Sequence, residues 1–450
     1  MALDTVAPQR PGTAPSAEQR RQARLGTIGS TIGNAVEWYD FFLYNTAAAL
    51  VFPALFFPDS SAYAGRLQAF ATYAVGFAAR PVGAALFGHW GDRIGRRATL
   101  LATLLLMGGS TVLVGLMPGT ASIGMWAPVL LVLLRVLQGF AAGGEWSGSV
   151  LLAMEWGDQR RRGLAASIPQ MGVAFGLILG TGFLYLLSWR LSAEQFAEWG
   201  WRIPFLLSTV MVAVGLFIRV RVLETPSFAR RVEQGRLHRL PALDAIGKHW
   251  RTILLCALAR MSEMAPFYVI TAFALGYMTR DRGYSTSFAL AAIMSAAVVE
   301  MAVIPLAGRL SDRFGRRRVY ALGAVLTAGY GFVLFAAIGT GVAWLAFGGV
   351  LLALVPHGLQ VAPQASLFAE SFPTSVRYSG AGMGFHLASV IAGGPAPLVA
   401  TWLLVTTGSV YAVAGAVVGC SVVTLVALAL LTDRADADID DDAVYQSLPR

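Results

Sequence analysis

Polar and charged side chains stand inside the first long apolar run of this sequence, where they could bind a proton or a solute. The run covers residues 26–50, and its polar residues are spaced by three, three and four positions, so they share one stripe of a helix. They are Asn34, Glu37, Asp40 and Tyr44. A charge at mid-depth in a membrane costs about 2.5–3.5 kcal/mol, and a carboxylate in a dry site takes up a proton readily. Glu37 and Asp40 are therefore the candidate proton carriers.

Arginines in other apolar runs supply the complementary charge. Arg80 lies between Gly76 and Gly83, whose small size allows another helix or a ligand to approach the guanidinium. Arg135 lies in the fourth run, and we expect it to tune the two proton carriers. Because an arginine presents a rigid fork that matches a carboxylate, Arg80 and Arg260 are the candidate anchors for a carboxylated substrate.

The remaining polar residues of the apolar runs complete a candidate substrate site. They are Asn34, Tyr44, Gln138, Glu263, Tyr268, Glu300 and His386. Together with the arginines they describe one central polar cavity, suited to proton-linked uptake of a polar, carboxylated solute. In the alternative, the charges pair with one another and only join helices. Glu300, and Glu145 on the same face as Arg135, fit that alternative best, and His357 is interpreted as a packing or helix-capping residue.

A short charged segment occurs twice in the chain, each time between two apolar runs. The first copy covers residues 88–97 and the second 308–317. The coinciding pairs are Gly88/Gly308, Asp92/Asp312, Arg93/Arg313, Gly95/Gly315, Arg96/Arg316 and Arg97/Arg317. Two copies in register indicate a duplicated chain with the same hinge in each half.

The composition is that of a polytopic α-helical membrane protein. Only 13% of the 450 residues are charged, about half the share of a soluble protein, and 56% are hydrophobic. Twelve runs are each long enough to cross ~30 Å of hydrocarbon as a helix. They cover residues 26–50, 68–90, 98–118, 127–153, 164–188, 202–221, 251–279, 286–308, 319–339, 342–366, 380–405 and 409–431. The predicted domains are an N-terminal tail (1–25), a six-helix bundle (26–221), a central loop (222–250), a second six-helix bundle (251–431) and an acidic, disordered tail (432–450).

The distribution of basic residues predicts the orientation in the membrane. Most of the 34 lysines and arginines fall on the side that holds the N-terminus, so both termini are predicted to be cytoplasmic in a plasma (inner) membrane. The net charge of +9 is thus a topology signal, and no nucleic-acid partner is expected.

The motifs of an enzyme are missing from the sequence. No metal-ligand spacing, phosphate-binding loop or Ser/His/Asp arrangement occurs, so we expect neither enzymatic activity nor a cofactor. The expected partners are a small-molecule substrate, protons and the lipid bilayer, with the proton gradient as energy source. No obligate protein partner is implied.

The paired hinges resemble the signature loop of the major facilitator superfamily, and the resemblance covers residues 26–431. It implies two pseudo-symmetric bundles that alternate access to a central site, with a cytoplasmic gate at the hinges. The implied gate residues are Asp92, Arg93, Arg96, Arg97, Glu155, Arg162, Asp312, Arg313, Arg316, Arg317, Glu370 and Arg377. We expect the two aspartates to pair with arginines of neighbouring helices, Glu155 to pair with Arg162, and Glu370 to pair with Arg377.

Several segments are similar to those of the metabolite:proton symporters within that superfamily, which carry shikimate, 2-oxoglutarate, citrate and proline/betaine. They are residues 33–41, 80–88, 135–146, 199–205 and 370–380. The shikimate-type branch looks nearest, although Phe385-His386 replaces a Tyr-Gln pair of the family. The resemblance implies a proton symporter importing a small polar metabolite, such as shikimate or a dicarboxylate. The alternatives are a zwitterion or osmolyte symporter, an efflux antiporter and a non-transporting receptor.

Overall fold

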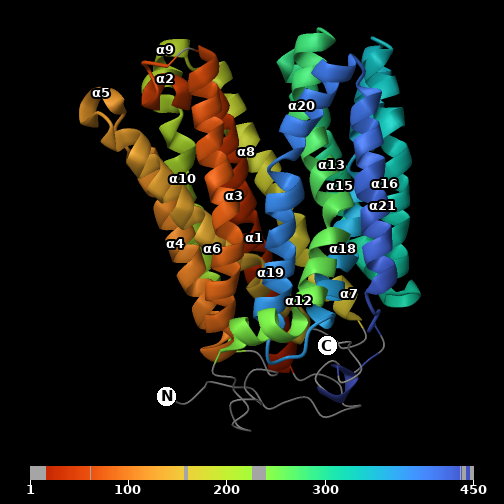
Figure 1. Ribbon diagram of the computed structural model, residues 1–450. Helices are drawn as coiled ribbons and strands as arrows, with labels where there is room; N and C mark the ends of the chain where they lie inside the picture. Colours follow the sequence, from red (N-terminus) through yellow and green to blue (C-terminus); the bar gives the residue numbers. More distant parts are fainter. Residues whose placement is uncertain are drawn as a thin grey trace.

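The computed structural model describes residues 17–60, 62–156, 161–224, 240–435, 437 and 442–445, and no strand occurs among them. Within these ranges the chain forms two bundles of long helices (Figure 1). The first contains α1 (Ala17–Leu50), α3 (Ala62–Arg93), α4 (Arg96–Leu116), α6 (Trp126–Trp156), α8 (Met171–Arg190) and α10 (Arg202–Arg219). The second contains α12 (Pro241–Ala259), α13 (Met261–Tyr268), α15 (Thr286–Phe314), α16 (Arg316–Gly339), α17 (Ala343–Leu351), α18 (Val355–Glu370), α19 (Arg377–Ala388), α20 (Ala396–Thr407) and α21 (Tyr411–Leu430).

Short segments connect the long helices. They are α2 (Phe52–Phe56), α5 (Thr120–Ile123), α7 (Arg162–Ser167), the 3-10 turn η2 (Ile168–Gln170), α9 (Ala193–Gln195), α14 (Ala274–Gly276), the 3-10 turn η7 (Asp442–Tyr445) and four π-helical segments, η3 (Phe196–Gly200), η4 (Val269–Phe273), η5 (Tyr277–Asp281) and η6 (Ser389–Gly393). The fold is the twelve-helix arrangement predicted from the sequence. Ten spans of the described chain are long and apolar enough to cross a membrane. The helices α1 and α3 correspond to the first two predicted spans.

Prolines interrupt the later spans that the sequence predicts as single helices. The tenth span is divided into α17 and α18 just before Pro356, and the eleventh is divided before α20 at Pro395. Proline has no N–H to donate to the preceding turn, so a helix breaks or bends where it occurs. The seventh span breaks at Arg260, which lies between α12 and α13.

The central loop and the C-terminal tail contain more structure than predicted. α12 begins at Pro241, inside the predicted loop, and bends at His249, whose φ of −125° is not helical. In the tail, Asp433 caps α16 by accepting from the Arg317 N–H at 2.9 Å, and residues 442–445 form a 3-10 turn. The rest of the predicted disorder, and residues 225–239 of the loop, lie outside the described residues.

Close glycine contacts hold α3 against α6 in the first bundle. A Cβ atom added to Gly83 would lie 2.1 Å from the Phe140 carbonyl oxygen, and one added to Gly143 would lie 2.2 Å from the Arg80 carbonyl oxygen. Side chains larger than hydrogen are excluded at both positions, so the two backbones meet directly. The contact places Arg80 of α3 and Arg135 of α6 on the same side of α1.

Candidate functional site

Two ion pairs lie side by side in the first bundle and line one small cavity. Arg80 Nη1 is 3.5 Å from Glu37 Oε1, and Arg135 Nη1 is 3.3 Å from Asp40 Oδ2. All four side chains are buried. The residues that line the cavity are Glu37, Asp40, Gly76, Arg80, Met107, Arg135, Gln138, Gly139 and Ala142. The structure therefore brings together the two predicted proton carriers and two of the predicted arginines.

Asp40 is the better satisfied of the two carboxylates. Its Oδ1 accepts hydrogen bonds from Thr111 Oγ1 at 2.6 Å and from Gln138 Nε2 at 2.8 Å, besides the contact of Oδ2 with Arg135. The Arg135 guanidinium also lies 4.2 Å from the centre of the Tyr44 ring, in a cation–π contact. Thr111 was not predicted, because the spacing of residues on one helix carries no information about which residue of α4 faces it.

The Arg80–Glu37 pair is less complete. Arg80 Nη1 and Glu37 Oε2 are both buried without a hydrogen-bond partner among the described residues. The Arg80 guanidinium lies over the rings of Phe41 and Phe77, at 5.3 and 5.1 Å from their centres. A charged pair with unused hydrogen-bonding capacity in an apolar frame can exchange partners with an incoming ligand.

Three contacts define the surroundings of these residues in the first bundle. The space beside Gly76 and Gly83 is filled by another helix, α6, which is one of the two expected neighbours: a Cβ atom at Gly76 would lie 2.7 Å from Arg135 Nε. Asn34 turns away from the cavity and donates to the Pro169 carbonyl oxygen at 2.7 Å. Glu145 forms a buried ion pair with Arg219.

Glu145 also accepts from Thr103 at 3.0 Å and from Ser149 at 2.9 Å. It therefore joins α4, α6 and α10, as the structural alternative expected. Tyr44 is likewise satisfied within its bundle, through a hydrogen bond of 2.6 Å between its hydroxyl and that of Thr72.

A second group of buried charges lies in the second bundle. Arg260 Nε is 2.7 Å from Glu263 Oε2, and the same guanidinium donates to the Phe385 carbonyl oxygen at 2.8 Å and to Ser389 Oγ at 3.2 Å. Arg260 thus fixes the start of α13 to α19 and its π-helical extension. Glu263 and His357 line a second small cavity, together with apolar residues such as Phe267 and Leu334.

His357 contacts two buried carboxylates and is not the packing or capping residue predicted. Its Nε2 lies 3.0 Å from Glu263 Oε1, and its Nδ1 contacts Glu300 Oε1. Its place in an apolar run misled the prediction, because both carboxylates come from other helices. The signal that could have found it is the presence of buried carboxylates in α13 and α15 at a similar depth.

Aromatic side chains lie between the charges of the two bundles. Tyr268 of α13 packs against Phe41 and Phe77 with ring centres 5.6 and 5.9 Å apart, and Phe267 packs against Trp38 at 5.7 Å. The ion pairs that line the two small cavities, Arg80–Glu37 and Arg135–Asp40 in one and His357–Glu263 in the other, close within their own half. The polar residues expected around one central cavity therefore line a small cavity in each bundle.

His386 lies between the bundles on α19 and is fully buried. Its neighbour Phe385 stacks on Trp146 of α6, with ring centres 3.7 Å apart and planes 13° apart. The hydroxyl of Tyr268 is buried and has no hydrogen-bond partner in the part of the chain that the structure describes. These two polar groups of the second half face the aromatic layer, where a solute between the bundles would meet them.

The hinge aspartates bind backbone N–H groups of the opposite half. Asp92 Oδ2 accepts from the Ser379 N–H at 3.0 Å and from Ser379 Oγ at 2.9 Å, at the first turn of α19. Asp312 accepts from the N–H groups of Gly163 and Leu164 at 2.8 and 2.9 Å, at the first turn of α7. Negative charge is stabilised at a helix N-terminus by its free N–H groups.

The sequence predicted arginines of neighbouring helices as the partners of these aspartates. The arginine contacts are present, from the first residues of α4 and α16: Arg96 Nη2 is 3.7 Å from Asp92, and Arg316 Nη1 is 2.6 Å from Asp312. The contacts by which the aspartates join the halves, however, are made to backbone N–H groups and were not predicted.

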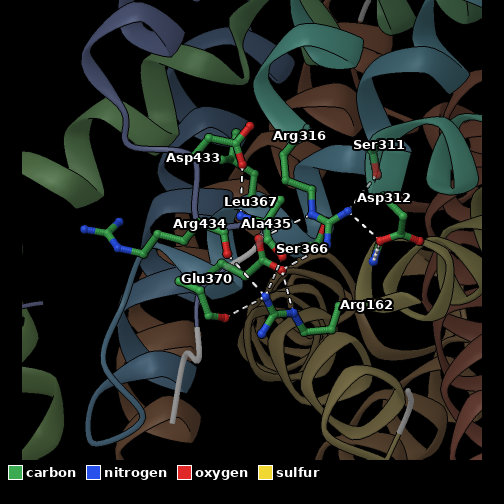
Figure 2. A network of polar contacts seen from close by, with 12 residues as sticks. Arg162, Ser311, Asp312, Arg316, Ser366, Leu367, Glu370, Asp433, Arg434 and Ala435 are labelled. Atoms are coloured by element: carbon green, nitrogen blue, oxygen red, sulfur yellow. Dashed lines mark hydrogen bonds and ion pairs between the residues drawn. The ribbon is translucent and has the colours of Figure 1, made fainter. Parts of the chain in front are cut away.

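The glutamate–arginine pairs cross between the halves. Arg162 Nε lies 3.1 Å from Glu370 Oε1, and Arg377 Nη1 lies 3.7 Å from Glu155 Oε1. Figure 2 shows Glu370 between Arg162 and Arg316, whose Nη2 is 3.2 Å from the same oxygen. The predicted pairing of Glu155 with Arg162 and of Glu370 with Arg377 is wrong. Residues seven apart on one chain lie on different helices here, and docking of the halves exchanges their partners.

Glycines of the repeated hinge allow the close contact. A Cβ atom at Gly88 would lie 2.7 Å from Ser379 Cα, and one at Gly308 would lie 2.3 Å from Ser167 Oγ. Gly95 and Gly315 precede α4 and α16 with φ of 120° and 95°, which other residues rarely adopt. At each of these four positions a larger residue would clash or would strain the backbone, which explains why glycine occurs there.

The outer residues of the hinge contribute differently. Arg97 donates to the Val220 carbonyl oxygen at 2.6 Å, and Arg317 donates to that of Ala429 at 3.0 Å. Arg93 and Arg313 are exposed, and no gate contact is seen for either within the described chain. Glu224 caps α4 by accepting from the Arg96 N–H at 3.0 Å, as Asp433 caps α16 in the other half.

The C-terminal segment covers the second half of this network. Arg162 Nη2 donates to the carbonyl oxygens of Arg434 and Ala435 at 3.2 and 2.9 Å (Figure 2), and the Tyr445 hydroxyl donates to the Glu370 carbonyl oxygen at 3.1 Å. Through these hydrogen bonds the C-terminal segment packs against the Arg162–Glu370 pair.

The described residues contain no group of three or more His, Cys, Asp and Glu side chains that could hold a metal ion. They contain buried ion pairs within the spans. They also contain two equivalent sets of hinge contacts, which join the halves at one end. A duplicated helical bundle with these features defines a secondary membrane transporter of two pseudo-symmetric halves.

Comparisons with known proteins agree. The family description "Sugar (and other) transporter" matches residues 26–240, and "Major Facilitator Superfamily" matches residues 255–443. The inner membrane metabolite transport protein YhjE of Escherichia coli (strain K12) is 41% identical over 388 residues, covering 85% of this chain and 88% of that protein. The shikimate transporter of the same organism is 41% identical over 386 residues, with the same coverage.

A more distant relative is the proline/betaine transporter of Salmonella typhimurium, 34% identical over 390 residues, which cover 85% of this chain and 78% of that protein. The structure of the proton:xylose symporter XylE bound to 6-bromo-6-deoxy-D-glucose matches with a TM-score of 0.78 at 18% identity, covering 95% of this chain and all of that one. The chain belongs to the major facilitator superfamily. It is a multi-pass membrane transporter of metabolites and not an enzyme.

Proposed function

We propose that this protein is a proton-coupled symporter that imports a small polar metabolite across the inner membrane, with both termini in the cytoplasm. The preferred substrate is an organic carboxylate such as shikimate or a dicarboxylate. The observation that carries the proposal is the pair of carboxylate–arginine contacts, Asp40–Arg135 and Glu37–Arg80, which line the same cavity. The relative named a shikimate transporter supports the carboxylate class.

Asp40 is the proposed proton carrier. Its contacts with Arg135, Thr111 and Gln138 hold the charged form, while burial opposes charge. A proton on Asp40 removes the charge that Arg135 neutralises, and Arg135 can then exchange this partner for a substrate anion or another carboxylate. The states with Asp40 charged and with Asp40 protonated differ by one unit of charge, so the proton gradient can shift the equilibrium between them.

Arg80 is the proposed anchor for the substrate carboxylate. Its Nη1 lies 3.5 Å from Glu37 Oε1, which is a long contact, and this same nitrogen has no hydrogen-bond partner among the described residues. Protonation of Glu37 would release the guanidinium for bidentate binding of a carboxylate. Tyr268, Arg260 and His386 of the second half are the proposed contacts across the aromatic layer.

The hinges are the proposed cytoplasmic gate. The contacts of Asp92 with α19 and of Asp312 with α7 keep the predicted cytoplasmic ends of the halves together. Alternating access requires these contacts to break when that side opens, with states only a few kcal/mol apart. Opening also separates Arg162 from Glu370 and Arg377 from Glu155.

Uptake into proteoliposomes tests the proposal. Purified protein is reconstituted, and uptake of radiolabelled shikimate, 2-oxoglutarate, citrate, proline and betaine is measured with and without an inward proton gradient. Accumulation of a carboxylate that depends on the gradient supports the proposal. Transport that ignores the gradient would overturn the symport mechanism while leaving the transporter class intact.

A zwitterion is the second candidate substrate. The cavity in the first bundle holds two carboxylates beside two arginines, so both ends of a zwitterion could be matched. Relatives named proline/betaine transporters are 33–34% identical to this chain. Preference for betaine over shikimate in the same uptake assay would select this alternative.

A further inference from the structure

One histidine of the second bundle lies between two buried carboxylates. His357 of α18 contacts Glu300 of α15 through Nδ1, and its Nε2 lies 3.0 Å from an oxygen of Glu263 of α13. His357 is 5% exposed, Glu263 2% and Glu300 1%. The group therefore joins three helices with very little water contact.

The contacts fix a minimum number of protons. A neutral imidazole carries one N–H and one lone pair, so it can donate to only one carboxylate. Facing two, either the ring carries both protons or one carboxyl holds the second. In each case the group of three binds one proton more than a neutral histidine with two carboxylates.

The surrounding charges require the same proton. Arg260 is the cation that contacts the group, at 2.7 Å from Glu263 Oε2. With the extra proton the two glutamates, the histidine and Arg260 sum to zero charge. Without it they leave one uncompensated negative charge, which is costly in a buried site.

The other described side chains that pack around His357 are uncharged. Phe267 of α13 stacks on the ring, with centres 4.7 Å apart. From α16, Tyr320 is reached through Gln364, which lies 3.3 Å from Glu263, and Tyr330 lines the cavity beside His357. From α21, Val417 lines the same cavity. Arg260 balances the charge of Glu263. No such partner balances a change in the protonation of Glu300 or His357 among the described residues.

We propose that Glu263, His357 and Glu300 form a second proton-binding site, separate from Asp40, that loads and releases a proton during transport. The inference rests on the proposed symport function and assigns it a second proton. Loss of that proton places a carboxylate against an imidazole lone pair and forces α15 away from α18. Asp312 lies on the same helix as Glu300, with Pro305 between them, so this shift reaches the contact of Asp312 with α7.

Spectroscopy of the full chain tests the site without a substrate. Protein labelled with ¹⁵N-histidine is reconstituted in lipid, and the His357 signals are assigned by their loss in His357→Gln. We expect an imidazolium signal, with both nitrogens protonated, at neutral pH. A neutral single tautomer throughout the range of pH 5 to 9, with no protonated-carboxyl infrared band lost in Glu300→Gln, would overturn the proposal.

Flux measurements test its part in transport. Proton and substrate influx are recorded together in proteoliposomes, using the substrate found in the uptake assay. We expect His357→Gln and Glu300→Gln to lower the ratio of protons to substrate by one, while His249→Gln, at the bend of α12, leaves it unchanged. An unchanged ratio in both variants refutes the second site. Failure of the wild-type protein to respond to the gradient would instead refute the proposed symport.

Discussion

Arg162 of the first half lies 3.1 Å from Glu370 of the second, and both side chains are buried. The matching pair, Arg377 and Glu155, crosses in the opposite direction at 3.7 Å. Each half thus supplies an arginine to the other half's glutamate. Separation of the halves at this end would break both contacts, and the four residues therefore belong to the proposed gate.

Exchange of charges tests this crossed pairing. Arg162→Glu should abolish uptake, because breaking a buried pair costs about 3–5 kcal/mol. Adding Glu370→Arg should restore part of the activity, since the pair is rebuilt with its charges reversed. The matched comparison is Arg162→Glu with Glu155→Arg, which should remain inactive in the same uptake assay. Rescue by Glu155→Arg instead would mean that the pairs close within each half.

The charge of Asp92 should be required for gating. Asp92→Asn keeps the shape but loses the charge that faces the N–H groups at the start of α19, an interaction of about 1–2 kcal/mol. We expect loss of uptake, with the protein still folded in the membrane and a cysteine near Ser379 more readily labelled from the hinge side. Asp59→Asn, at an exposed position, is the control. Normal transport by Asp92→Asn would contradict the gate.

Steric closeness at the hinge gives an independent test. Gly88→Ala should weaken the closed contact, because the new Cβ atom would lie 2.7 Å from Ser379 Cα. Gly109→Ala serves as the control, since no atom lies within 4 Å of a Cβ atom there. Crosslinking between the halves should fall in the first variant and stay at the wild-type level in the second. Equal crosslinking in both would show that the halves do not meet at Gly88.

Proton coupling should depend on Asp40. Asp40→Asn keeps the size of the side chain, and its one oxygen can still accept from Thr111 and Gln138, but the amide cannot carry a proton or balance the charge of Arg135. We predict that gradient-driven accumulation is lost while exchange of labelled for unlabelled substrate persists, because exchange needs no net proton movement. Both are measured in the same proteoliposomes. Gradient-driven accumulation by the variant would move the coupling site elsewhere.

The guanidinium fork of Arg80 should set substrate affinity. Arg80→Lys keeps the charge but replaces the bidentate fork with a single ammonium group. We expect the half-saturating concentration of a carboxylated substrate to rise about tenfold, equivalent to ~1.4 kcal/mol. Arg221→Lys, at an exposed position, should leave it unchanged. An unaltered affinity in Arg80→Lys would remove Arg80 from the binding site.

The sequence by itself determined the class of protein and its duplication. Apolar runs of membrane length and a repeated hinge are local properties, readable without knowing what packs against what. The stripe of Glu37 and Asp40 was also readable, because helical periodicity alone places them on one face. The carboxylates and arginines that line the cavity of the first bundle were therefore among the predicted residues.

Only the tertiary structure decided which charges meet. The helix stripe gives a direction, but the partner depends on the neighbouring helix and its depth. Glu145 paired with Arg219, Asn34 turned to Pro169, and His357 came to lie between Glu263 and Glu300, each through contacts across long stretches of sequence. The crossed pairing of Arg162 with Glu370 arises only when the two halves dock, since a repeat within one chain is equally compatible with pairing inside each half.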